Sequence, residues 1–188
     1  MGGRSLRGDQ GKVDPAGDPD ASGQALCREC GLCCDGTLFA TAVIGEGEDV
    51  DRLRTIGITT ISEDGRSFSL PCKPYDQVCT IYDSGRARIC RSFRCRLLRR
   101  HESGEVSLEA AKEIVRSAKA HRETVATLLS IACGALDGNL VKRFEALWAS
   151  RKDVRSEERS VAMLHFVALA LRLNRHFREP REFGKAPG

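Results

Sequence analysis

The sequence predicts an α-rich α+β fold, in which a small cysteine-cluster lobe with short strands is followed by a three-helix C-terminal lobe. Two observations favour this fold. Eight of the nine cysteines lie between Cys27 and Cys95, and apolar residues after Gly104 recur at helical spacing. A chain of 188 residues has room for one domain, or for one domain with an appendage. We expect a disordered tail at 1–24, the cysteine-cluster lobe at 25–103, a helical lobe packed on it at 104–178, and a frayed tail at 179–188.

The first cysteine group, Cys27 to Cys34, reads C-R-E-C-G-L-C-C. A C-x2-C pair lets two thiolates point at one ion across a tight turn, and Gly31 suits a backbone that turns with positive φ. This spacing is found in tetrahedral zinc sites. The longer C-x2-C-x2-C run also resembles the ligand spacing of iron–sulfur clusters. Both metals fit the pattern.

The second group follows the pattern P-C-x6-C-x-I-Y-x7-C-R-x-F-x-C, and Ile81 and Tyr82 are expected to pack beside the site. Cysteine is common in protein cores, but eight clustered cysteines are not explained by core filling. The predicted metal ligands are Cys27, Cys30, Cys33, Cys34, Cys72, Cys79, Cys90 and Cys95. All-sulfur ligands point to zinc or to iron–sulfur and away from magnesium or calcium. The predicted cofactor is therefore an iron–sulfur cluster or Zn²⁺.

Three short elements are predicted between the two cysteine groups. Residues Thr37 to Ile44 are β-branched and aromatic enough for a strand. Residues Glu48 to Ile56 read as a helix with Gly57 as its C-cap. Residues Ile58 to Leu70 read as a hairpin, because an Asp-Gly pair marks its turn.

The chain is expected to be cytoplasmic, with no membrane partner. No apolar signal segment is visible near its start, and the most apolar run, Val161 to Leu173, is shorter than the 18 or so residues of a membrane span. A reducing cytosol disfavours structural disulfides, so clustered cysteines there are typical of metal or redox sites.

Seven arginines and no acidic residue lie between Arg86 and Arg100. They are consistent with a solvated helix face, with compensation of the negative charge of a thiolate cluster, or with a site for a polyanion. The net charge of the chain is only +4, and Phe93 is the lone aromatic residue within this stretch. Nucleic acid is therefore not expected as a partner.

The last part of the chain predicts three helices. The first begins at the N-cap Ser107 and carries an apolar stripe to Ala132, with His121 on or beside that stripe as a structural residue. The second spans Asn139 to Arg151, and the third begins at Ser156. From Val161 to Leu173 the third is apolar nearly all round, which favours burial between other helices. Cys133, distant from both groups, is expected to be a small core residue.

The assembled motifs resemble the YkgJ-type cysteine-cluster family of zinc- or iron-chelating CxxCxxCC domains. The resemblance covers about residues 26–100, and Arg86-Ala87 departs from an Arg-Pro step that is frequent in the family. It implies a class of cofactor and not a reaction. The matching residues are Cys27, Cys30, Cys33, Cys34, Pro71, Cys72, Cys79, Ile81, Tyr82, Cys90, Arg91, Phe93 and Cys95.

Two hypotheses of function follow from the sequence. In the first, the protein chelates iron as an iron–sulfur cluster, or zinc, and has a redox or enzyme-associated role of unknown reaction. In the second, zinc stabilises a structural or protein-interaction module without catalysis, and the helical lobe contacts an unknown protein partner. The sequence offers no nucleophile–base pair to name as catalytic residues.

Overall fold

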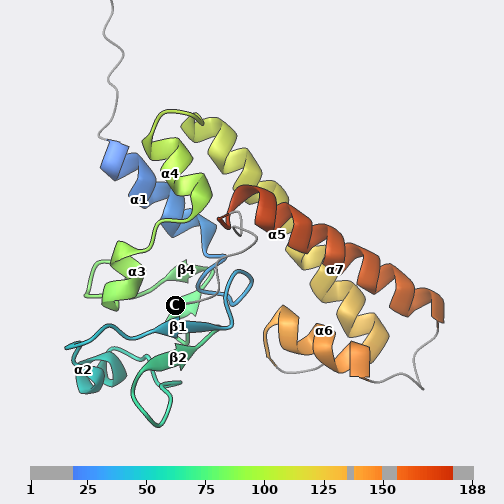
Figure 1. Cartoon of the computed structure of the whole chain (residues 1–188), viewed down its shortest axis with the longest axis horizontal. Helices are drawn as coiled ribbons and strands as arrows, with labels where there is room; N and C mark the ends of the chain where they lie inside the picture. The colour runs from blue at the N-terminus through green and yellow to red at the C-terminus, as the bar shows by residue number, and fades with distance from the viewer. Residues whose placement is uncertain (1–18, 135–137, 150–155, 180–188) are drawn as a thin grey trace, which may run out of the picture.

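The computed structural model describes residues 19–134, 138–149 and 156–179 (Figure 1). An α-rich α+β fold is confirmed, with seven helices and four short strands in the described part of the chain. Its elements are, in order, α1 (Pro19–Cys30), β1 (Thr41–Val43), α2 (Val50–Thr55), β2 (Ser67–Ser69), β3 (Tyr75–Asp76), β4 (Val78–Cys79), α3 (Arg88–Ser92), α4 (Arg96–Glu102), α5 (Leu108–Cys133), α6 (Leu140–Ala149) and α7 (Ser156–His176).

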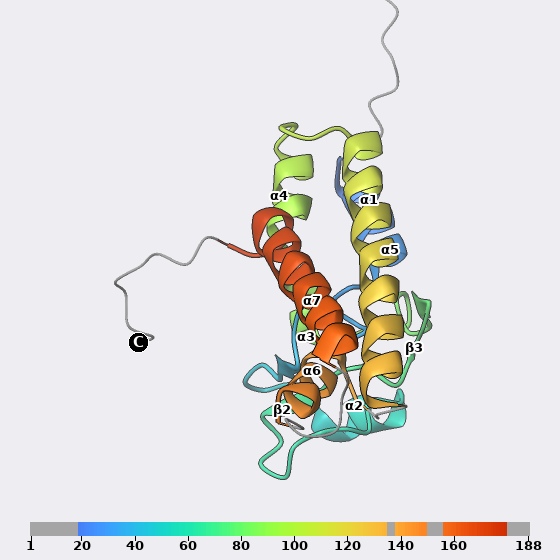
Figure 2. The same ribbon diagram turned by 90° about the vertical axis from the view of Figure 1, so that its right-hand side faces the viewer.

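The long helix α5 is the axis of the helical part. Ser107 begins it as predicted, because its side chain accepts a hydrogen bond from the Ala110 amide at 3.2 Å. Helix α7 runs alongside α5, and α1 and α4 pack near the start of α5 (Figures 1 and 2). The larger hydrophobic core joins all these helices, and α6 as well, through buried residues such as Leu98, Val125 and Leu169. Helices α1 and α4, which the sequence assigned to the cysteine-cluster lobe, therefore pack on the helical core.

A second, smaller core lies among the short strands and α2. It is built on Leu53, Ile58, Phe68 and Ala87, all of them buried. Strand β1 pairs antiparallel with β2, and a second small sheet joins β3 to β4. The predicted hairpin over 58–70 is present, with the Ser69 amide bonded to the Thr60 carbonyl at 2.9 Å, but its second strand takes β1 as its ladder partner.

The sequence placed residues 19–24 in a disordered tail, and this part of the expectation is wrong. They form the first turns of α1, while residues 1–18 lie outside the described part of the chain. Gly23 is buried against α4, and a Cβ added there would lie 3.2 Å from the side chains of Leu98 and Glu102. Close helix packing of this kind outweighs the weak helical propensity of the segment.

The expectation that α7 is buried all round is also wrong. Its inner face, with Ala162, Leu169 and Leu173, packs into the larger core. Its outer face is open, and Leu164 is 70% and Leu171 64% exposed. None of the helices that the structure describes is both long enough and apolar enough to cross a membrane.

Candidate metal centre

The first two cysteines stand on the last turn of a helix. Cys27 and Cys30 lie three residues apart in α1, so the predicted tight turn between them is replaced by helix. The turn comes immediately afterwards at Gly31, whose φ is +67°. A Cβ at this position would lie 2.6 Å from ring carbons of Tyr75, so both the conformation and the space require glycine.

The neighbouring cysteines Cys33 and Cys34 face different parts of the molecule. Cys33 packs against the larger core together with Cys30, and Cys34 packs against the smaller core beside Cys72. A compact turn holds the dipeptide, with the Asp35 amide bonded to the Gly31 carbonyl at 3.0 Å. The two adjacent thiols therefore pack against different cores, although they belong to one cysteine group in the sequence.

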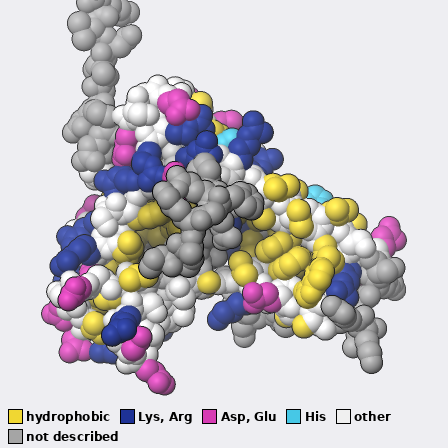
Figure 3. Space-filling view, in the orientation of Figure 1, with side chains coloured by type: hydrophobic (Ala, Val, Ile, Leu, Met, Phe, Trp, Pro, Cys, Tyr) yellow, Lys and Arg dark blue, Asp and Glu magenta, His cyan; other side chains and the backbone are white. Residues whose placement is uncertain are grey.

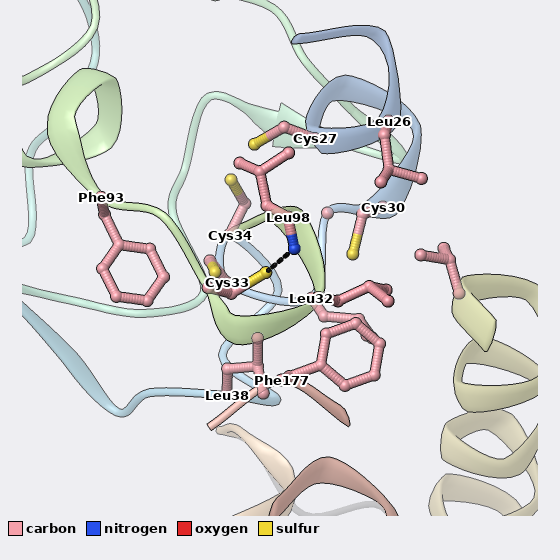
Figure 4. Close-up of a pocket in the computed structure, with 14 residues that line it drawn as sticks. Leu26, Cys27, Cys30, Leu32, Cys33, Cys34, Leu38, Phe93, Leu98 and Phe177 are labelled. Atoms are coloured by element: carbon pink, nitrogen blue, oxygen red, sulfur yellow. Dashed lines mark hydrogen bonds between the residues drawn. The ribbon is translucent and has the colours of Figure 1, made fainter. Parts of the chain in front are cut away.

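Four thiols form what we call the helix group: Cys27, Cys30, Cys33 and Cys95. All four line a cavity of about 50 Å³, together with Cys34 and with apolar side chains that include Leu26, Leu32, Leu38 and Phe177 (Figure 4). Cys95 is the N-cap of α4, and its sulfur accepts a hydrogen bond from the Leu98 amide at 3.4 Å. Amide-to-sulfur hydrogen bonds favour thiolate ligands.

The other four thiols form the hairpin group: Cys34, Cys72, Cys79 and Cys90. A backbone hydrogen bond of 2.7 Å from the Cys72 amide to the Cys34 carbonyl joins the two cysteine segments. The tight β3–β4 hairpin then turns at Gln77, which has a φ of +58°, and pairs Cys79 with Tyr75. Helix α3 supplies Cys90, whereas Cys34 and Cys72 lie outside the helices and strands.

The hairpin group opens into a much larger cavity than the helix group. This cavity has a volume of about 260 Å³, and all four thiols line it. Most of its wall is apolar and includes Phe39, Phe68, Leu70 and Ile89. Cys27 and Cys33 of the helix group reach the same wall, so the two groups are neighbours.

Burial raises the pKa of Cys30, Cys72 and Cys90 well above that of a free cysteine. The pKa rises to about 12 for Cys30 and for Cys72 and to about 11 for Cys90, first because of burial and then partly because neighbouring thiolates repel one another. The repulsion also crosses between the two groups, because Cys79 raises the pKa of Cys27. The pKa of Cys33 responds chiefly to Cys30 among its neighbours.

Repulsion between neighbouring thiolates also raises the pKa of a thiol in the hairpin group. Burial raises the pKa of Cys34, and the neighbours that raise it further include Cys79, Cys90 and Cys72. A cation bound among each set of four would remove this repulsion and hold the thiols as thiolates. The sulfur-only donors and their mutual repulsion therefore fit a bound zinc or iron.

Arg86 is the positively charged side chain that is best placed to act as a partner of the cysteine groups. Its guanidinium lies 3.4 Å above the Tyr82 ring, and its Nη1 donates to the Cys90 carbonyl at 3.4 Å. Its Nε is buried without a hydrogen-bond partner. Against the dominant effect of burial, Arg86 lowers the pKa of both Cys27 and Cys90. A thiolate or a metal-bound sulfur would give this donor an acceptor.

The remaining arginines of the basic stretch mostly have partners within the chain. Arg94 pairs with Glu102 at 3.0 Å, Arg100 pairs with Glu105 at 2.8 Å, and Arg99 pairs with Glu179. These ion pairs leave less free positive charge than the sequence suggests. Ile81 and Tyr82 lie in the wall of the larger cavity, beside the site as expected.

The described residues contain no three His, Cys, Asp or Glu side chains already arranged to hold a metal ion. The eight cysteines are free of disulfide bonds, and their sulfurs line the two cavities without converging on one point. The sulfurs of each group would therefore have to move closer together to bind one ion. The structure leaves the ligand set a prediction.

Three further residues complete the comparison with the sequence. His121 is partly buried and lies edge-on to His165, with ring centroids 5.7 Å apart, away from both cysteine groups. Asp35 pairs with Arg122 of α5 at 3.3 Å and accepts the Thr37 amide, which ties the Cys33-Cys34 turn to the long helix. The side chain of Cys133 lies outside the described residues.

The comparison with known families agrees with this geometry. Residues 26–114 match the family model described as "CxxCxxCC: Putative zinc- or iron-chelating domain". The matched stretch contains all eight thiols of the two groups. Searches of curated proteins and of solved structures found no match. The family supports metal binding and leaves zinc and iron as alternatives.

Proposed function

We propose that this protein binds metal at two thiolate-ligated centres, one in the helix group and one in the hairpin group. In this proposal the helix group holds a closed structural metal. The hairpin group holds iron as an iron–sulfur cluster and has a redox or enzyme-associated role. The proposal includes a reducing compartment such as the cytoplasm, because the thiols must stay reduced to bind metal.

The divergence of the adjacent Cys33 and Cys34 carries the proposal. Cys33 packs against the larger core with Cys30 and Cys95, and Cys34 packs against the smaller core with Cys72 and Cys90. We assign Cys27, one helical turn before Cys30, to the first set, and Cys79, which lines the larger cavity, to the second. Four thiolates complete a tetrahedral zinc site and also bind a [4Fe–4S] cluster. A single shared site would instead require the two side chains to face the same way.

The cavities support different roles for the two groups. Four Zn–S bonds of about 2.3 Å draw the sulfurs into a tight tetrahedron. The cavity of about 50 Å³ at the helix group suits such a closed site. The cavity of about 260 Å³ at the hairpin group has room for a larger group, and its apolar wall limits water.

An iron–sulfur cluster at the hairpin group would supply electron transfer, with a potential that depends on charge and hydrogen bonding nearby. Cys34, Cys72, Cys79 and Cys90 would hold it. The guanidinium of Arg86 would offset the negative charge of the thiolates and donate a hydrogen bond to sulfur. A reaction or substrate is not part of the proposal.

The second candidate is a zinc-stabilised interaction module without catalysis. Its support is the small second core, which has only seven buried residues and gains stability from a metal crosslink. In that case both groups hold zinc, and the helical part serves to contact a partner.

Metal analysis of the full-length protein, purified without oxygen, tests the proposal. We would measure iron, zinc and acid-labile sulfide per chain, together with the visible spectrum, for the wild type and for C30S, C72S and C133A. The wild type should contain iron and sulfide and absorb near ~400 nm. C72S should lose iron and colour, whereas C30S should lose only the metal of the helix group.

C133A is the matched control, because Cys133 belongs to neither group and its removal should leave the metal content unchanged. A colourless protein with zinc alone would favour the second candidate. If C30S and C72S each removed all metal, a folded chain by circular dichroism would point to one shared site. The two-centre proposal would then be wrong.

A further inference from the structure

The outer face of α7 carries an apolar stripe that no described element covers. Val161 is 37%, Leu164 70%, Val167 51% and Leu171 64% exposed. Hydrophobic side chains gather over the half of the molecule where α6 and α7 lie (Figure 3). Isolated exposed leucines are common on protein surfaces, but a continuous stripe of this kind marks a contact site.

The stripe has the spacing of a helix–helix seam. Six exposed residues follow one another at intervals of four, three, four, three and four positions. This is the 3.5-residue repeat at which one helix packs lengthwise on another. We call this set the α7 seam, and its members are Glu157, Val161, Leu164, Ala168, Leu171 and Arg175.

The α7 seam is complementary to the α7 seam of a second copy that runs in the opposite direction. It has an acidic residue at one end, a basic residue at the other, and apolar residues between them. When two copies run antiparallel about a two-fold axis beside residue 166, Glu157 of each faces Arg175 of the other. Val161 then faces Leu171, and Leu164 faces Ala168, where a small side chain leaves room for a leucine.

We propose that two copies of this chain associate through antiparallel pairing of their α7 seams. A parallel pairing would put Glu157 against its own copy and Arg175 against its own copy, which is unfavourable. Opposite helix dipoles add to the preference for the antiparallel arrangement. Helix α7, about 30 Å long at 1.5 Å per residue, offers four apolar layers and two symmetric charge pairs.

The packing of the inner face of α7 is also consistent with a contact between two copies through the outer face. Ala162, Leu169 and Leu173 hold α7 on α5, so the outer face is presented on a supported helix. A two-fold contact uses the same patch on both subunits. The inference rests on α7 alone and does not depend on the metal assignment.

Sedimentation and light scattering of the full-length, metal-loaded protein test the proposal. Reducing agent is kept present, so that disulfide crosslinking does not produce a dimer. The wild type should show a reversible monomer–dimer equilibrium. L164E should raise the dissociation constant about a hundredfold or more, because each of two symmetric contacts loses a buried leucine. V43E is the matched control, since Val43 is a similarly exposed apolar residue of β1.

Charge reversal tests the antiparallel register. E157R and R175E should each raise the dissociation constant roughly tenfold, because each replaces two opposite-charge pairs by like charges. The double variant should restore wild-type association. Circular dichroism checks that every variant is folded. A wild type that stays monomeric at all concentrations, or a double variant no better than the single ones, would overturn the proposal.

Discussion

The two cysteine groups differ in what holds them in place. The helix group is attached to α1 and α4, which are anchored in the larger core beside α5. The hairpin group lies on a strand of two residues, a helix of five and two irregular segments, around a core of seven buried residues. A site on long helices is positioned by packing, whereas a site on short elements depends on what its own side chains bind. The hairpin region should therefore be the part whose order depends on metal.

The largest expected effect is that of metal removal. Chelation should abolish amide protection across the segment that carries the hairpin group, because a core of seven residues is too small to replace a metal crosslink. Protection in α5 and α7 should persist. Hydrogen exchange read by mass spectrometry gives both regions at once, and equal loss in both would remove the distinction between them.

The next effect is the response of the metal-free protein to alkaline pH. Burial holds the folded pKa of Cys90 at about 11 and that of Cys30 and Cys72 at about 12, against 9.0 for a free thiol. Unfolded chains therefore release these protons first, and the unfolded state binds fewer protons above pH 9. The stability of the folded metal-free chain should be intact below pH 9 and fall between pH 9 and about 12.

Urea titrations at several pH values would measure this fall. Metal-loaded protein is the control, because its thiols are already ionised as ligands and should not titrate in that window. A metal-free protein whose stability is constant across the window would contradict the burial of the thiols.

A smaller effect should follow from G31A, which acts where α1 ends. Alanine is strained at φ +67°, and its Cβ would overlap the Tyr75 ring. We expect a loss of about 3 kcal/mol in unfolding free energy by denaturant titration. G47A is the control, since Gly47 also has positive φ but has no atom within 4 Å of an added Cβ. That variant should lose only about 1 kcal/mol.

R86Q should give the smallest effect, which is a lower metal affinity in a protein that still folds. Removing an outer hydrogen bond and charge from a metal site typically costs about ten- to a hundredfold in affinity. Competition with a chelator measures it at the hairpin group. Arg91, an exposed neighbour, provides the control R91Q. Equal metal affinity in the two variants would show that Arg86 serves only to stack on Tyr82.

The sequence predicted the fold class and the long helix well, because strong signals mark them. The N-cap Ser107, the apolar period of α5 and the Asp-Gly turn are all local. Helix α1 was missed because its stability comes from the packing of Gly23 and Leu26 on the rest of the fold rather than from local helical propensity. Local sequence patterns do not predict such tertiary contacts.

The division of the cysteines was also beyond the sequence. Order along the chain places Cys34 with Cys33 and places Cys95 with Cys90. The fold places the members of each pair against different cores, because a backbone hydrogen bond draws Cys72 to Cys34 and the N-cap of α4 carries Cys95 to α1. Which thiols share a cavity is a property of long-range pairing. The prediction that α7 is buried on all sides was wrong for a similar reason, because an apolar helix face can be covered by a second molecule instead of by the same chain.

The Cys33-Cys34 peptide bond gives the two proposed centres a direct covalent link. Consecutive Cα atoms are about 3.8 Å apart, so the route from one sulfur to the other runs through two side chains and one peptide unit. Any strain that one centre places on its ligand reaches the other within a single residue. Filling one centre then shifts the metal affinity of the other without emptying it, and an insertion between these two residues would uncouple them without removing a ligand.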